Sequence, residues 1–240
     1  TGSGEDFYDS AMKLADKNGI AHVQKYVDLM PEGKVPVISE FGIFRSTNPL
    51  LRSQTHAVYI AKCLMEYVRL GSPYIQKHCL VDWYSEGADS LGPTQQAVIQ
   101  AVPQEGADTS TGEGNYKFFS TPSAHVFEML NGMFGNEIIS SNFSYMPKFA
   151  STVDVFNALA SKDEEGNIYL AVVNLDKNEK RNIEVQVDGV DLTNKVVDVQ
   201  KLAGDSFSEE NTLDNPNNVE IEKSKFVVDN EGMNLELDPH

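Results

Sequence analysis

The stretch Pro36-Val-Ile-Ser-Glu-Phe-Gly42 decides the fold of the first half of the chain. The run from Val35 to Ser39 is apolar and β-branched, which is typical of a buried parallel strand. Because proline cannot donate a hydrogen bond from a strand centre, we expect the strand to begin beside Pro36. Glu40 follows this run directly, so a carboxylate lies where the chain leaves the sheet.

Helical patterns flank this strand on both sides. Apolar residues spaced by three and four predict helical structure over residues 5–30, with Gly19 either dividing it into two helices or kinking one. A second apolar stripe predicts a helix over residues 51–68, which Gly71 ends. Residues 74–81 then read as a second apolar strand. This α, β, α, β order is typical of a parallel sheet with covering helices.

The remainder of the chain changes its pattern twice. Residues 85–117 are rich in Gly, Ser, Thr and Gln and predict a long loop. A third helix is predicted over residues 121–133. Beyond residue 136 the apolar period becomes two, with turn-forming stretches between short runs, which predicts an all-β sandwich. We therefore divide the chain into residues 1–135 and residues 136–240.

The acidic composition of the chain disfavours some classes of binding partner. The chain has 240 residues, of which 40% are hydrophobic and 23% charged, and its formal net charge is −17. Such an acidic surface repels nucleic-acid phosphates and anionic lipid heads, and it favours neutral substrates. The sequence contains no run of about 18 apolar residues. We therefore expect neither a nucleic-acid partner nor association with a membrane.

The cysteines and histidines do not form a metal-binding pattern. Cys63 and Cys79 lie in apolar runs without Cys-x-x-Cys spacing, and we interpret both as small buried hydrophobic residues, with a disulfide left open. The five histidines are scattered along the chain. We therefore predict no metal site and no cofactor.

Residues at the ends of the two predicted strands point to carbohydrate chemistry. Glu40 follows the first strand, and the second ends in Asp82-Trp83-Tyr84, so we expect an indole beside the carboxylate. In a (β/α)8 barrel, active sites lie at the carboxyl ends of the strands. A retaining glycosidase needs a carboxylate nucleophile, an acid/base carboxyl group roughly 5 Å away, and often an aromatic wall. Glu40 supplies the nucleophile and Trp83 the wall.

Each of these assignments has a structural alternative. Glu40 also fits a solvated or ion-paired acidic residue at a strand exit, and Trp83 also fits a core or interface aromatic residue. Tyr84 and His78 are further candidates for substrate binding. His78 lies inside the predicted strand, however, where a packed or hydrogen-bonded role competes with a role in the site.

The chain resembles the large clan of retaining (β/α)8 glycosidases. Val37-Ile-Ser-Glu-Phe-Gly42 looks like the end of the seventh barrel strand of this clan, and residues 74–84 look like the eighth strand. Within the clan, the chain is most similar to the family 51 α-L-arabinofuranosidases and their relatives. The segments that resemble their last barrel helix and their sandwich strands are residues 119–130 with Phe134-Gly135, residues 169–174 and residues 235–240.

The resemblance implies a fold and an activity. Residues 1–135 would be the C-terminal part of a (β/α)8 barrel, holding two of its eight strands, and residues 136–240 an antiparallel β-sandwich. The implied activity is hydrolysis of α-L-arabinofuranosyl residues on plant polysaccharides by double displacement, with Glu40 as nucleophile and no cofactor. The acid/base, which in this clan follows the fourth strand, lies outside this sequence, so we expect this segment alone to be inactive.

The same resemblance implies partners and a location. The substrate would be an arabinose-containing oligo- or polysaccharide. Two strands of a barrel leave open edges, which either the missing part of the same barrel or a homo-oligomer would complete. Degradation of plant polysaccharides favours a secreted protein over a cytoplasmic one, although related arabinofuranosidases are often intracellular.

Two other functions stay open. An endo-β-glycanase of the same clan, such as a mannanase, xylanase or glucanase, would use the same nucleophile, but the long sandwich disfavours the simplest of these enzymes. A non-catalytic carbohydrate-binding fragment is the other alternative, because a chain without its acid/base cannot complete the mechanism alone. The aromatic residues of the β region fit core positions as well as a binding platform.

Overall fold

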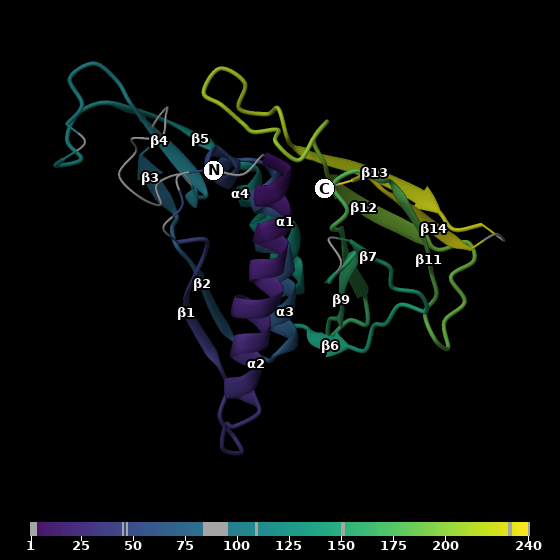
Figure 1. The fold of residues 1–240 in the computed structure, drawn as a ribbon. Coiled ribbons are helices and arrows are strands. Elements are labelled where there is room, and N and C mark those ends of the chain that lie inside the picture. The colour runs from purple at the N-terminus through teal and green to yellow at the C-terminus, as the bar shows by residue number, and fades with distance from the viewer. Residues whose placement is uncertain are drawn as a thin grey trace.

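A layer of helices stands at the centre of the molecule, with a short parallel sheet on one side and antiparallel strands on the other (Figure 1). In the described part of the chain, no helix is both long and apolar enough to cross a membrane. The computed structural model describes residues 4–44, 46, 48–83, 96–108, 110–149, 152–229 and 232–239.

The N-terminal helical segment is continuous. It consists of α1 (Gly4–Leu14), a π-helical turn η1 (Ala15–Ile20) and α2 (Ala21–Val27). Gly19 lies in the π-helical turn, so the predicted irregularity is a local widening of one helical segment. A β-carbon at Gly19 would lie 3.1 Å from the Tyr67 hydroxyl oxygen, so glycine lets the next helix approach closely at this point.

A parallel β-α-β unit follows, as the sequence predicted. Strand β1 (Val37–Phe41) begins directly after Pro36 and pairs in parallel with β2 (Tyr74–Lys77). Helix α3 (Gln54–Arg69) connects the two strands. Two parallel neighbours need such a crossover, because a tight turn can join only antiparallel strands. Their carboxyl ends therefore meet at the same edge of the sheet.

Helix α3 is buried on nearly every face. The short helix η2 (Pro49–Arg52) leads into it, and the Ser53 side chain caps its first turn by accepting a hydrogen bond from Thr55 N at 3.2 Å. Of its 16 residues, 13 are buried, and they lie on all sides of the helix axis. A helix buried all round lies between two layers of structure rather than at the surface.

The region after β2 differs from the prediction of a single strand. Strand β2 ends at Lys77, and a separate strand β3 (Val81–Trp83) begins after a short break. Strand β3 does not extend the pairing with β1 but lies parallel to β4 (Ile99–Pro103). The prediction was wrong because one apolar run can supply two strands that belong to different sheets.

The predicted long loop over residues 85–117 was also wrong in its second half. It contains β4 and the start of β5 (Tyr116–Ser120), which pair antiparallel. Gln100 and Ala101 of β4 are fully buried. A polar and a small side chain therefore occupy core positions here, and apolar periodicity does not reveal a strand of this composition.

The third predicted helix and the change to antiparallel strands are confirmed. Helix α4 (Pro122–Leu130) continues into η4 (Asn131–Met133), with proline in its first turn. Beyond Gly135 the strand pairs are antiparallel, forming the sheet β10-β9-β6 and the pairs β7-β8, β11-β14 and β12-β13. These strands are β6 (Glu137–Ile139), β7 (Lys148–Phe149), β8 (Val153–Asp154), β9 (Phe156–Lys162), β10 (Ile168–Asn174), β11 (Arg181–Val185), β12 (Val196–Leu202), β13 (Ile221–Val227) and β14 (Met233–Leu237).

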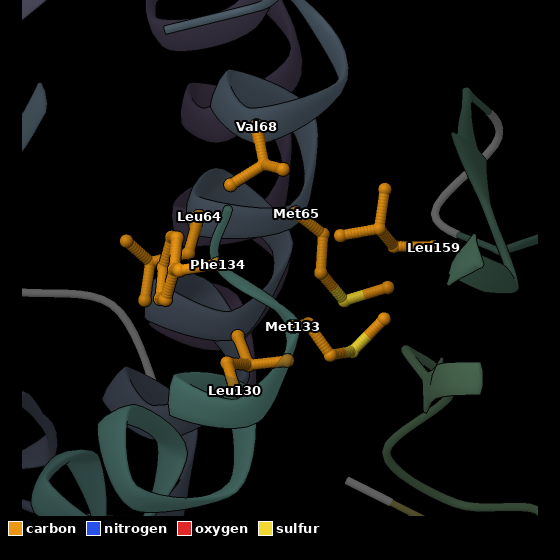
Figure 2. Close-up of a pocket in the computed structure, with 7 residues that line it drawn as sticks. All are labelled: Leu64, Met65, Val68, Leu130, Met133, Phe134 and Leu159. Atoms are coloured by element: carbon orange, nitrogen blue, oxygen red, sulfur yellow. The ribbon is translucent and has the colours of Figure 1, made fainter. Parts of the chain in front are cut away.

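The helical layer packs on the β region through apolar side chains. Figure 2 shows where they meet: Met65 of α3 and Met133 of η4 point toward Leu159 of β9. The cavity between them has a volume of about 10 Å³ and only apolar lining. Such a space has no polar partner for water and no room for a ligand, so it is a small packing void.

Both cysteines are free, and one of them departs from its predicted burial. Cys63 on α3 is fully buried, and burial raises the pKa of its thiol to about 12. Cys79 lies in the break between β2 and β3 and is half-buried, with its Sγ 3.7 Å from Asp82 Oδ2. Burial and this carboxylate raise the pKa of Cys79 to about 11. Both side chains therefore stay protonated at neutral pH.

An ion pair joins the start of α3 to the β region. Arg52 Nε lies 3.0 Å from Glu210 Oε2, and the Arg52 side chain is only 7% exposed. We expect Arg52→Met to lower the free energy of unfolding by about 2 kcal/mol, because Glu210 would lose its partner in a partly desolvated position. Urea unfolding of the 240-residue chain measures this change.

A surface lysine supplies the matched control for Arg52. Lys225 of β13 pairs with Asp198, and both side chains are exposed, Lys225 by 70%. Lys225→Met should leave the urea midpoint unchanged, because solvent screens a pair of this kind. Equal effects of the two substitutions would contradict a structural role for the Arg52–Glu210 pair.

Candidate active site

The structure brings two of the predicted site residues together at the carboxyl end of the parallel pair. Glu40 lies near the end of β1, and His78 directly follows β2. Glu40 Oε1 is 3.1 Å from His78 Nδ1, and the two side chains are 57% and 35% exposed. A carboxylate that contacts an imidazole through one oxygen and is open to solvent can attack or pair with a bound molecule through the other oxygen.

An aromatic ring completes this exposed cluster. Phe44, three residues after the end of β1, places its ring centroid 5.6 Å from that of His78. Its side chain is exposed, so it does not belong to the core. Carboxylate, imidazole and phenyl ring therefore share one accessible surface. Such a mixture of one polar pair and an apolar wall suits a neutral, hydroxylated ligand better than an anion.

Trp83, the predicted aromatic wall, packs against another strand of its own sheet. It ends β3, and its indole stacks on Tyr116 of β5 with ring centroids 5.1 Å apart and planes 26° apart. A β-carbon at Gly112 would lie 3.5 Å from Trp83 Cη2, so the β4–β5 hairpin also borders the ring. The chain itself therefore covers part of the indole. Tyr84, the other predicted aromatic contact, lies outside the described residues.

Tyr116 is a residue of this region that the sequence reasoning missed. It lies within the stretch predicted as a loop, although it begins the short aromatic run Tyr116-Lys-Phe-Phe119. That run of aromatic residues was the available signal for a strand. Because Tyr116 pairs with Pro103 in the β4–β5 ladder, its ring is positioned by a regular strand.

A polar pair, a partly buried lysine and a fully buried glutamine, joins the ends of β1 and β2 and was also missed from the sequence. Lys77 Nζ donates to the backbone oxygens of Gln96, at 2.8 Å, and of His78. Gln96 Oε1 accepts a hydrogen bond from Ile43 N at 2.9 Å, and its side chain is fully buried. Lysine and glutamine are ordinarily surface residues, so neither suggests an inward position on its own.

Burial lowers the pKa of Lys77 to about 7. The oxygens that accept its hydrogen bonds are uncharged amide oxygens, which do not offset the loss of solvation as a carboxylate would. The pKa of His56 on α3 lies well below its usual range, mainly because the side chain is buried and secondly because of the positive charge of Lys77. His56 therefore stays neutral, with Nδ1 3.4 Å from Ser123 Oγ.

The described residues contain no group of three or more His, Cys, Asp or Glu side chains arranged to hold a metal ion.

Comparison with known proteins identifies the family. Residues 96–240 match the model of the alpha-L-arabinofuranosidase C-terminal domain. The chain belongs to this family. The resemblance to arabinofuranosidases predicted from the sequence is thereby confirmed. The match begins inside the part that we assigned to the α/β region, so the boundary at residue 135 stays a prediction. No curated protein matches the sequence.

Solved arabinofuranosidases have a similar fold. The α-L-arabinofuranosidase from Thermotoga maritima in complex with arabinose aligns with a TM-score of 0.69 and 19% identity, over 100% of this chain and 49% of that chain. The family 51 enzyme from Thermotoga petrophila RKU-1 aligns at 0.66 and 18%, over 96% and 47%. AbfB, a family 51 enzyme from Bifidobacterium longum, aligns at 0.64 and 15%, over 98% and 46%. This arabinofuranosidase-family chain thus spans about half the length of the solved structures that it matches.

We expect Lys77→Met to change how stability depends on pH. The pKa of Lys77 falls from its ordinary 10.5 to about 7 in the folded chain. Between these values the unfolded chain binds more protons, so the contribution of Lys77 to stability rises with pH over this interval and is fully lost once pH has fallen to about 7. The methionine variant lacks this rise. Urea midpoints of both proteins between about pH 6 and about pH 9 measure the difference.

Lys225→Met is again the control, because the side chain of Lys225 is largely exposed. Its midpoints should follow those of the wild type at every pH. A constant difference between Lys77→Met and the wild type over this range would contradict the lowered pKa of Lys77.

Proposed function

We propose that this chain is the C-terminal part of a retaining α-L-arabinofuranosidase in which Glu40 is the nucleophile. The observation that carries the proposal is the pair formed by Glu40 and His78 at the carboxyl end of β1 and β2. Active sites of parallel β/α folds lie at this end of the strands. Membership of the arabinofuranosidase C-terminal domain family and the fold likeness to arabinofuranosidases support the substrate class.

The proposed reaction is a double displacement. One oxygen of Glu40 attacks the anomeric carbon of an α-L-arabinofuranosyl residue, and the bond from that carbon to the leaving oxygen breaks. An acid/base outside this chain protonates the leaving oxygen and then removes a proton from the water that releases arabinose. The contact of His78 with one carboxylate oxygen of Glu40 leaves the other oxygen to face the sugar. Trp83 and Tyr84 are the proposed aromatic contacts to the substrate.

In the whole protein that we propose, β1 and β2 are the last two strands of a (β/α)8 barrel and residues 136–240 are its β-sandwich. Val35, Val37 and Tyr74, beside or on these strands, are each more than half exposed. A cluster of exposed apolar side chains on a sheet marks a surface that another element covers. The earlier strands of the same barrel fit this position, and so does a second copy of the chain.

An activated substrate tests the nucleophile without the missing acid/base. Dinitrophenolate leaves without a proton, so dinitrophenyl α-L-arabinofuranoside needs only Glu40 for the first step. We expect the wild-type chain to release one equivalent of dinitrophenolate and to gain the mass of one arabinosyl group on Glu40. Intact-mass spectrometry and peptide mapping measure this, and Glu40→Gln should remain unlabelled.

Glu137→Gln is the matched control, because Glu137 is an exposed carboxylate on β6, in the β region. It should be labelled like the wild type. Labelling of Glu40→Gln, or a folded wild-type chain that releases no dinitrophenolate, would contradict the nucleophile assignment. Labelling by the corresponding xyloside, glucoside or mannoside instead would identify an endo-β-glycanase of the same clan.

A further inference from the structure

The two strands that carry the candidate site separate at the point where the site begins. The last ladder contact is the hydrogen bond from His78 N to Phe41 O at 3.0 Å, next to the pair of Phe41 with Lys77. The register of the two strands already shifts between Ile38 and Phe41. Regular pairing therefore does not by itself fix the positions of Glu40 and His78.

Lys77 and Gln96 join the backbone beyond this point. Gln96 Oε1 holds Ile43 N at 2.9 Å, and Lys77 Nζ approaches the same oxygen at 3.5 Å. The ammonium group also donates to the backbone oxygens of His78 and Gln96. Three segments that are distant in sequence thus meet at one ammonium and one amide.

Gly42 has to be glycine for this arrangement. A β-carbon there would lie 2.3 Å from Gln96 Oε1 and 3.3 Å from the backbone oxygen of His78. The Gln96 amide therefore packs directly against the main chain of the turn that follows Glu40. The hydroxyl of Tyr59 on α3 donates to Gly42 O at 3.3 Å, so the turn is fixed from the helix side as well.

Stability alone does not account for a glutamine in this place. Gln96 Nε2 is buried and has no hydrogen-bond partner among the described residues. An unpaired buried polar group lowers the stability of the fold, whereas an apolar side chain of similar size carries no such cost. Lys77 loses solvation in the same region without a carboxylate among its hydrogen-bond acceptors. Residues that break local rules in this way are expected where geometry matters more than stability.

We propose that Lys77 and Gln96 are positioning residues that hold the turn at Gly42–Ile43 against His78 and thereby keep the Glu40 carboxylate in contact with the imidazole. They touch no substrate. Their importance for turnover rests on the proposed function, but the geometry that they impose is measurable without any substrate.

The test follows the imidazole resonances of His78 by NMR in the 240-residue chain with isotope-labelled histidine, assigned with His78→Asn. Glu40→Gln should shift these resonances, because the imidazole loses its carboxylate partner. Gln96→Leu should shift them in the same direction by at least half as much. Gln96→Glu should restore the wild-type positions, because a carboxylate oxygen can accept from Ile43 N and from Lys77. His125, which faces Glu128, is the internal control and should not move.

A folded Gln96→Leu with unchanged His78 resonances would overturn the proposal and leave Gln96 a purely structural residue. If Gln96→Leu does not fold, Lys77→Met takes its place: a folded Lys77→Met with unchanged His78 resonances would overturn the proposal. Unchanged resonances in Glu40→Gln would overturn the Glu40–His78 contact itself. The His78 resonances could shift as expected while the dinitrophenyl arabinoside fails to label the chain. That result would support the positioning role and overturn the proposed function, so the two failures are distinguishable.

Discussion

Burial of α3 on nearly every face is the constraint on which the rest of the structure depends. As the crossover between β1 and β2, this helix makes the two strands parallel. Because they are parallel, Glu40 and His78 reach the same edge of the sheet from different strands, although they are 38 positions apart in the sequence. The candidate site is thus a direct consequence of where one helix lies.

The β region covers α3 and also supplies hydrogen-bond acceptors for its first turn. The first backbone N–H groups of a helix have no partner within the helix. Two of these groups in α3 donate to backbone oxygens that lie more than 150 residues later in the chain. Gln54 N donates to Glu209 O at 2.8 Å, and Thr55 N donates to Phe207 O at 2.9 Å. The loop before β13 therefore caps the crossover helix of the parallel sheet. The two parts predicted from the sequence depend on each other for stability, whatever the boundary between them.

The sequence predicted those features that depend on neighbouring residues. The period of apolar positions predicted the helical segment before Pro31, the crossover helix and the β1 strand. Glu40 was predicted directly after that strand but lies within it, one residue before its end. The features that it did not predict depend on distant partners. Strand β4 buries Gln100, and Trp83 is oriented by Tyr116 in another strand. Neither contact leaves a local pattern.

The same argument explains why the polar pair behind the site was missed. Lys77 and Gln96 acquire their roles through main-chain groups that are distant in sequence: Lys77 donates to Gln96 O, and Gln96 Oε1 accepts from Ile43 N. Elsewhere in the described chain, a buried lysine has a carboxylate: Lys62 lies 2.8 Å from Asp16. Lys77 is held by amide oxygens instead, next to the Gln96 amide nitrogen, which is buried and has no hydrogen-bond partner among the described residues. Both departures from ordinary packing lie at the end of the sheet that carries Glu40, where the proposed site would account for them.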